Sequence, residues 1–93
     1  MTLTKQEVKK ALKGYMNRVL TDRHGEEYCV INLGYKNAPA NYHQFSEQEK
    51  AEVIEILNNL GLNNKDYSIF SGTEQRTKIT EVKILFYLDD SNI

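Results

Sequence analysis

Few side chains in this sequence have both the type and the spacing that chemistry requires. Its two histidines, His24 and His43, and its single cysteine, Cys29, lack the paired spacing of a zinc site, and no glycine-rich phosphate loop or calcium-binding loop is present. Asp22 and His24 stand close enough for an acid–base pair, but a turn at residues 21–25 explains both without catalysis. Cys29 lies in a hydrophobic run and is interpreted as a core residue. We therefore expect no catalytic residue, no metal and no cofactor.

The segment KNAPANYHQF, residues 36–45, concentrates polar and aromatic side chains and holds the only proline. It is longer than most connections between elements, and long ordered connections are often functional. Tyrosine offers a large contact area at low entropic cost, and asparagine adapts its hydrogen bonding. We predict that a partner protein contacts this segment and the residue before it, specifically Tyr35, Lys36, Asn37, Asn41, Tyr42 and His43. The alternative is a plain loop whose Tyr42 and Phe45 pack on the core.

A helix is predicted directly after this segment. Ser46 and Glu49 form a capping box, and Gly61 followed by Leu62 is typical of a Schellman ending. The inward stripe consists of Val53, Ile54, Leu57 and Leu60. Glu52 and Glu55 on the polar face complete the predicted partner-binding set, because carboxylates would suit a basic partner. Solubility alone is the alternative explanation for these two acids.

The N-terminal part of the chain predicts another helix, over residues 5–20. Thr4 and Glu7 form a capping box, and the apolar stripe consists of Val8, Ala11, Leu12, Tyr15, Met16 and Val19. Its outer side carries a basic cluster. A solvated face explains this cluster, and the alternative is a nucleic-acid-binding site formed by Lys9, Lys10, Lys13 and Arg18.

Three strands are predicted, at residues 26–35, 67–71 and 77–88. Alternation in the first places Tyr28, Val30 and Asn32 on one face and Cys29, Ile31, Leu33 and Tyr35 on the other. Both faces are largely apolar, which indicates a central or doubly covered strand. In the last strand Val82, Ile84, Phe86 and Leu88 share one face, and a more mixed row that includes Leu85 and Tyr87 faces the other way.

The element order α-β-α-β-β predicts one α+β domain over residues 1–93, with 89–93 as a frayed tail. We expect two helices on one face of a three-stranded mixed sheet, with a right-handed crossover that makes the first two strands parallel. The position of the third strand, central or at an edge, stays open. The second sheet face would be uncovered, which predicts either a partner protein or a homodimer through that face.

Composition and charge restrict the partner. The apolar content of 40% and charged content of 27% are those of a globular domain, and no apolar run approaches the roughly 20 residues that span a bilayer. We expect a cytoplasmic protein with no membrane contact. The net charge of −1 argues against general phosphate binding, although residues 1–25 are basic and residues 46–66 acidic.

In size and in its abundance of Lys, Glu, Asn and Tyr, the whole chain resembles small accessory proteins of phages and mobile elements in low-GC Gram-positive bacteria, among them the anti-CRISPR proteins. This resemblance implies a single-domain inhibitor that occupies a functional surface of a host protein without catalysis. Our first hypothesis is therefore a non-catalytic protein-binding module, an inhibitor or regulator. A nucleic-acid-binding domain comes second, and a small ligand-binding domain or enzyme that uses His43 with Tyr42 comes third.

Overall fold

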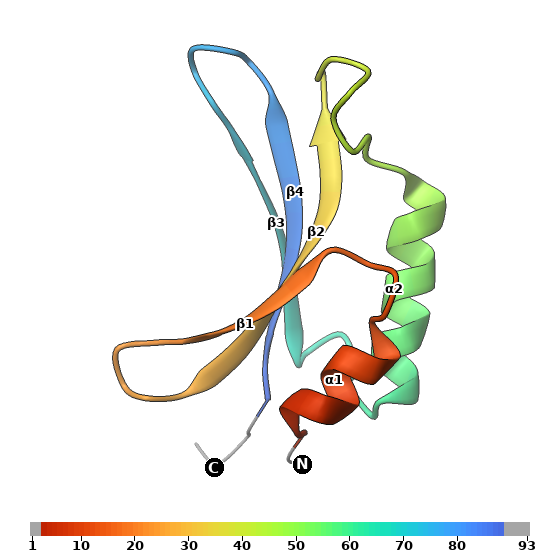
Figure 1. Cartoon of the computed structure of the whole chain (residues 1–93), viewed down its shortest axis with the longest axis vertical. Helices are drawn as coiled ribbons and strands as arrows, with labels where there is room; N and C mark the ends of the chain where they lie inside the picture. The colour runs from red at the N-terminus through yellow and green to blue at the C-terminus, as the bar shows by residue number, and fades with distance from the viewer. Residues whose placement is uncertain (1–2, 89–93) are drawn as a thin grey trace.

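The computed structural model describes residues 3–88, which form two helices packed on one four-stranded sheet (Figure 1). The elements in chain order are α1 (Lys5–Ala11), β1 (Asn17–Thr21), β2 (Glu27–Lys36), α2 (Glu47–Asn59), β3 (Tyr67–Thr73) and β4 (Thr80–Tyr87). All neighbouring strands are antiparallel, in the order β1-β2-β4-β3. The predicted α+β class is confirmed, whereas the predicted three-stranded mixed sheet is wrong.

The error lies mainly in the N-terminal third, where the predicted helix over 5–20 ends at Ala11. Gly14 adopts φ +97°, a left-handed conformation that interrupts the helix and suits glycine. The Asn17 side chain then donates to the carbonyl oxygens of Leu12 and Tyr15, at 3.3 and 2.8 Å. Residues 17–21 become strand β1, and the turn at 21–25 joins two strands instead of a helix and a strand.

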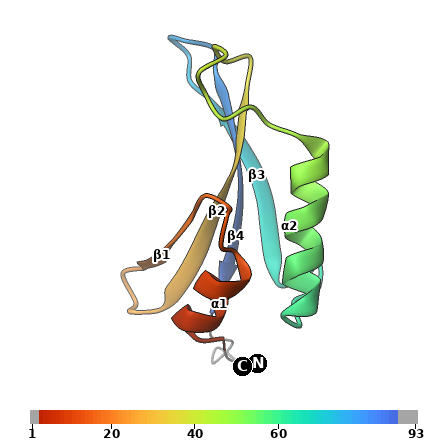
Figure 2. The same ribbon diagram turned by 45° about the vertical axis from the view of Figure 1, so that its right-hand side comes forward.

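The predicted parallel pairing of β2 with β3 is also wrong. The two strands run in the same direction, but β4 lies between them and is antiparallel to both. The chain thus consists of two successive units, each a helix followed by an antiparallel hairpin, joined along β2 and β4 (Figure 2). The arrangement is symmetric: each hairpin contributes one edge strand, β1 or β3, and one central strand, β2 or β4. Strand β2 is central, as its two apolar faces predicted.

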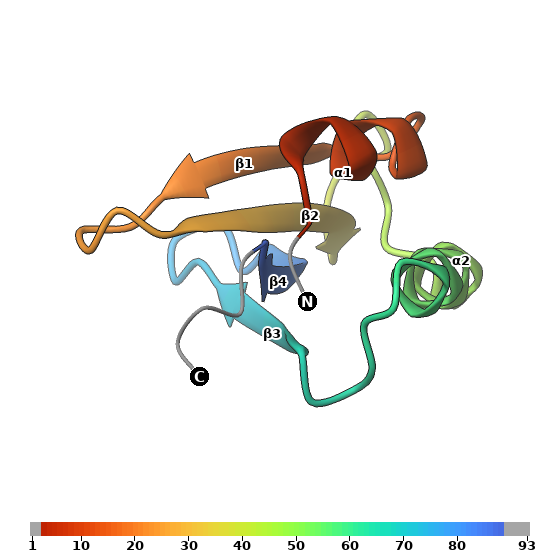
Figure 3. The ribbon, with the colours of Figure 1, turned by 90° about the horizontal axis from the view of Figure 1, so that it is seen from below.

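The core lies between the helices and one face of the sheet (Figure 3). The side chains fully removed from solvent come from α1, α2, β2 and β4, and comprise Val8, Leu12, Cys29, Ile31, Leu33, Val53, Leu57, Ile84 and Phe86. Leu3 closes one end of this core, and its N–H donates to the carbonyl of Leu88 at 2.7 Å.

Helix α2 has the predicted ends. The Ser46 side chain accepts from the N–H of Glu49, and the Leu62 N–H donates to the Leu57 carbonyl at 3.0 Å in the Schellman ending. The Glu49 side chain turns instead to His43, with Oε2 2.9 Å from Nε2, so only the Ser46 half of the predicted capping box is present. Within residues 3–88, neither helix has the length and apolar character that crossing a membrane would require.

A β-bulge in β2 changes which way Tyr35 points. The pairing with β4 shifts between Asn32 and Gly34, so that Leu33 is an extra residue in β2. Leu33 remains buried, while Tyr35 pairs with Glu81. The predicted alternation, which placed Tyr35 on the same face as Cys29, is therefore wrong beyond the bulge.

Candidate functional site

The sheet face opposite the helices, here called the open face, is not covered by any element among residues 3–88 (Figure 3). Strand register places polar, aromatic and aliphatic side chains on it, namely Arg18, Leu20, Tyr28, Val30, Asn32, Tyr35, Phe70, Glu81, Lys83, Leu85 and Tyr87. Tyr28 and Tyr87 lie side by side on the two central strands, with ring centroids 5.5 Å apart. The uncovered face that the sequence predicted is therefore present, and it is broader than expected because β1 extends it.

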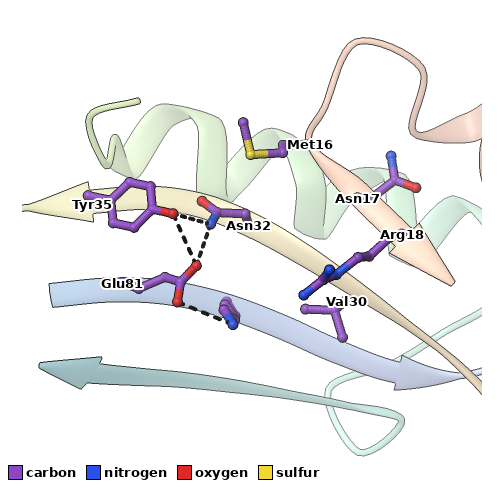
Figure 4. A pocket seen from close by; sticks show the side chains of 8 residues that line it. Met16, Asn17, Arg18, Val30, Asn32, Tyr35 and Glu81 are labelled. Carbon is purple, nitrogen blue, oxygen red and sulfur yellow. Dashed lines mark hydrogen bonds and ion pairs between the residues drawn. The ribbon is translucent and has the colours of Figure 1, made fainter. Parts of the chain in front are cut away.

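One polar cluster on the open face is built around the carboxylate of Glu81 (Figure 4). Its Oε2 accepts from Asn32 Nδ2 at 2.7 Å and from the Tyr35 hydroxyl at 3.3 Å, and its Oε1 pairs with Lys83 Nζ at 3.2 Å. Asn32 is held in turn by the Gly34 N–H, which donates to Asn32 Oδ1 at 2.7 Å. The cluster lines a cavity of about 270 Å³, together with Met16, Asn17, Arg18 and Val30.

A larger cavity lies beside this cluster, at the end of the sheet where the β3–β4 hairpin meets the segment after β2. We call it the tyrosine cleft; it has a volume of about 540 Å³ and is lined by Tyr35, Tyr42, Gly72, Thr73, Glu74, Thr77, Ile79 and Glu81. The rings of Tyr35 and Tyr42 meet edge to face, with centroids 5.3 Å apart. Its lining includes the carboxylates of Glu74 and Glu81 and no lysine or arginine, but Glu81 is already paired with Lys83, so the cleft is suited to a cation chiefly through Glu74 and the two tyrosine rings.

Tyr42 reaches the cleft because the segment after β2 folds back onto that strand. The Tyr35 N–H donates to the His43 carbonyl at 2.7 Å, and the Phe45 N–H donates to the Tyr35 carbonyl at 2.9 Å. The side chain of Gln44 closes the loop through the Pro39 carbonyl at 2.7 Å. Phe45 packs against the core, as the plain-loop alternative expected, but Tyr42 remains 40% exposed.

The predicted partner-binding residues do not all lie in one place. Tyr35 and Tyr42 meet in the cleft, while Lys36 places its Nζ 4.7 Å from the centre of the Phe45 ring. Asn37 and Asn41 are exposed in the same loop. His43 points to helix α2, where its Nε2 lies 2.9 Å from Glu49 Oε2. The loop residues thus form one region, of which the two tyrosines face the cavity.

Glu52 and Glu55 are exposed on α2, away from the open face. Glu52 Oε1 accepts from the Tyr15 hydroxyl at 3.0 Å, and this hydrogen bond raises the pKa of Tyr15. Glu52 therefore ties α2 to the connection between α1 and β1. These two acids do not line the cleft with the two tyrosines.

The basic residues are also divided. Lys9 and Lys10 lie in the last turn of α1, on the helix side of the molecule, and Lys13 follows that helix. Arg18, predicted on the same helix, lies on β1 and lines the smaller cavity of the open face (Figure 4). The four side chains do not form a single patch.

Three lining residues, Glu74, Glu81 and Asn32, were missed by sequence reasoning. The alternation of β4 placed Glu81 and Lys83 on the mixed face, which was the available signal. Their meeting with Asn32 and Tyr35 depends on the pairing of β2 with β4. Glu74 enters the cleft through the hairpin turn, which carries no local signal for this role.

Two residues considered for chemistry have structural roles. Asp22 Oδ1 accepts from the N–H groups of Glu26 and His24, at 3.0 and 2.8 Å, and these bonds hold its pKa below the ordinary value. Cys29 is fully buried, and desolvation raises its pKa to about 12, so its thiol is not a nucleophile in the folded state. Among residues 3–88, no three His, Cys, Asp or Glu side chains converge in a metal-binding group.

Comparison of the chain with protein-family models, with curated proteins and with solved structures finds no match. The site is therefore interpreted from its own geometry.

Proposed function

We propose that this chain is a non-catalytic protein-binding module, an inhibitor or regulator that occupies a basic functional surface of a partner protein. The observation that carries the proposal is the tyrosine cleft, in which Tyr35 and Tyr42 stand beside Glu74 and Glu81. As part of the same proposal, the protein acts in the cytoplasm and belongs with the small accessory proteins of phages and mobile elements.

The lining of the cleft suits an arginine or lysine side chain of the partner. A guanidinium stacks on aromatic rings and pairs with carboxylates, and both groups are present within one cavity. Tyrosine and arginine are also the residues that most often dominate binding energy at protein interfaces. The polar cluster around Glu81 holds Tyr35 in position, which lowers the entropic cost of binding.

The cleft does not favour the nucleic-acid hypothesis. Its two carboxylates would repel phosphates, and the lysines of α1 lie on the opposite side of the sheet from the tyrosines. Of the predicted phosphate-binding residues only Arg18 shares a cavity with a tyrosine, Tyr35, whereas a nucleic-acid site needs several basic side chains together with its stacking residues. The reaction hypothesis that paired His43 with Tyr42 is likewise disfavoured, because His43 contacts Glu49 on α2.

The direct test uses fluorescein-labelled short peptides, one rich in arginine and one rich in glutamate, titrated with the full chain and followed by fluorescence anisotropy. We expect binding of the arginine-rich peptide only. Tyr42→Ala and Glu74→Lys should each weaken it at least about tenfold, because one removes the exposed ring and the other places a positive charge in the cleft. Glu55→Lys is the matched control, since it makes the same charge change at an exposed position on α2, away from the cleft, and should leave binding unchanged.

A pull-down from bacterial lysate, with and without nuclease, tests the partner itself. We expect a protein that resists nuclease and is lost with the Tyr42→Ala variant. Retention of that protein by the Tyr42→Ala and Glu74→Lys variants, or loss of all bound material after nuclease, would contradict the proposal.

A further inference from the structure

Strand β3 forms an unprotected edge of the sheet. Within residues 3–88 it pairs with β4 only, and its sequence YSIFSGT contains no charged residue and no proline. Natural edge strands usually carry lysines, prolines or bulges that block pairing with another chain. The opposite edge, β1, has five residues and includes Arg18. Of the two edge strands, β1 carries a charged residue and β3 carries none, so β3 is the edge more open to pairing with another chain.

The exposed apolar side chains of β3 lie on both sides of the sheet. Phe70 is 45% exposed on the open face, and Ile69 is 41% exposed on the face that carries the helices. A partner docked on one sheet face would cover only one of them. A further strand paired with β3 would have side chains on both faces of the sheet, so it would contact both Ile69 and Phe70.

The free backbone groups of this edge follow from the ladder. The Glu74 N–H donates to the Ile79 carbonyl at 3.0 Å, which continues the β3–β4 register and points the N–H of Glu74 toward β4. In an antiparallel pair the hydrogen-bonding residues alternate. The N–H and C=O groups of Tyr67, Ile69 and Ser71 therefore point away from β4, toward the open edge.

We infer that β3 pairs with β3 of a second copy of this chain, antiparallel about a two-fold axis centred on Ile69. In this register Tyr67 lies opposite Ser71 of the second copy and Phe70 opposite Ser68, so that each aromatic side chain faces a serine, and the two Ile69 side chains meet on the axis. A register centred on Phe70 would bring Asp66 opposite Glu74, two like charges. The strand is therefore complementary to itself in bulk and charge.

The pairing continues the sheet from one copy into the other. A two-fold axis perpendicular to the sheet keeps both open faces on the same side, so the dimer would present two tyrosine clefts in one direction. Only the last two residues of β3, Gly72 and Thr73, also line the cleft, and the dimer does not depend on the proposed function.

Sedimentation velocity of the full chain over a range of concentrations tests the dimer. We expect concentration-dependent dimerisation of the wild-type protein. Ile69→Lys should raise the dimer dissociation constant at least about tenfold, because two lysines would meet on the axis. Thr21→Lys is the control, since it adds the same charge to the other edge strand, and the dimer should persist. A wild-type chain that stays monomeric, or dimers that tolerate Ile69→Lys, would overturn the inference.

Cross-linking tests the register. Residues on the axis of a hydrogen-bonded pair have Cα atoms about 5.5 Å apart, within disulfide range. Ile69→Cys should therefore form a disulfide-linked dimer under mild oxidation, whereas Phe70→Cys should not, because its Cβ atoms would lie roughly 7–8 Å apart. The native Cys29 is buried and does not interfere. Cross-linking of Phe70→Cys in place of Ile69→Cys would refute this register.

The Tyr42→Ala variant should dimerise like the wild-type protein. A failure of the dimer proposal can therefore be distinguished from a failure of the proposed peptide binding in the cleft.

Discussion

Gly34 shows how a single residue determines the position of the candidate site. It adopts φ +118°, and a Cβ atom there would lie 2.7 Å from the backbone nitrogen of Phe45 and 2.8 Å from the carbonyl carbon of Gln44. Neither contact can be relieved by rotating a side chain, since both atoms belong to the backbone. The return of the loop onto β2, and with it the placement of Tyr42, therefore depends on glycine at position 34.

Gly34→Ala should destabilise the protein by about 2 kcal/mol or more, because both the backbone conformation and the close approach become unfavourable. Gly72→Ala is the matched control, since no atom lies within 4 Å of the corresponding Cβ position and no positive φ is required there. Urea denaturation followed by circular dichroism measures both variants. Equal midpoints for the two alanine variants would contradict this role of Gly34.

At the residue scale, the sequence identified two of the residues that line the cleft. Tyr35 and Tyr42 were predicted from composition and loop length, and both line it. The orientation of Tyr35 was not predictable, because the bulge at Leu33 inverts the alternation and has no clear signal other than the glycine that follows. Glu74 and Glu81 come from the other hairpin, and only long-range pairing brings them to the tyrosines.

At the scale of single elements, the sequence predicted both ends of α2 correctly but placed the end of α1 too late. Helix α2 has its predicted Ser46 cap and Gly61 ending. In α1 the apolar spacing of Val8 and Leu12 continues by coincidence through Met16 and Val19, although Met16 is 56% exposed and Val19 belongs to β1. The predicted end of this helix depended on the regular apolar spacing alone and took no account of Gly14, whose φ of +97° follows the actual end of the helix.

The β1–β2 turn should make stability depend on acidic pH. The pKa of Asp22 is lowered from 3.8 chiefly by the Glu26 N–H, then by the His24 N–H, the Tyr87 hydroxyl at 3.1 Å and the charge of His24. A lowered pKa in the folded state stabilises the protein above the ordinary pKa, and this contribution is lost as pH falls below it. Stability should therefore drop as the pH falls below about 4.

Asp22→Asn should reduce that pH dependence, because the neutral amide does not titrate. Tyr87→Phe is a milder variant that keeps the ring and removes one donor, so it should reduce the dependence only in part. Denaturant midpoints at pH 7 and pH 3 for the three proteins measure the effect. An unchanged pH dependence in Asp22→Asn would show that other carboxylates dominate.

At the scale of the whole molecule, the fold class followed from sequence but the strand order did not. Alternation and capping define the elements locally, whereas the position of β4 between β2 and β3 depends on contacts between residues far apart in the chain. The short strand β1 was hidden in the predicted helix, and without it a three-stranded sheet was the natural inference. Residues 89–93, predicted as a frayed tail, lie outside the described residues.

The two-unit topology predicts where the structure opens first. Strands β2 and β4 are central and supply Ile31, Leu33, Ile84 and Phe86 to the core, so their amides should exchange slowest with deuterium. The amides of residues 75–77, in the exposed hairpin turn, should exchange fastest. Hydrogen exchange measured by NMR at low protein concentration tests this ranking. Faster exchange in β2 than in β3 would contradict the central position of the β2–β4 pairing.

The hydrogen bond between Leu3 and Leu88 has a practical consequence for handling the protein. It brings both ends of the described chain together at one end of a body that measures 40 × 28 × 21 Å, while the hairpin turn and the loop after β2 lie at the other end of the long axis (Figure 1). A fluorescent protein or a surface linker fused at either terminus would therefore stand well clear of the tyrosine cleft. The same adjacency favours a circular permutant, in which a short linker joins the termini and new ends open at residues 63–66.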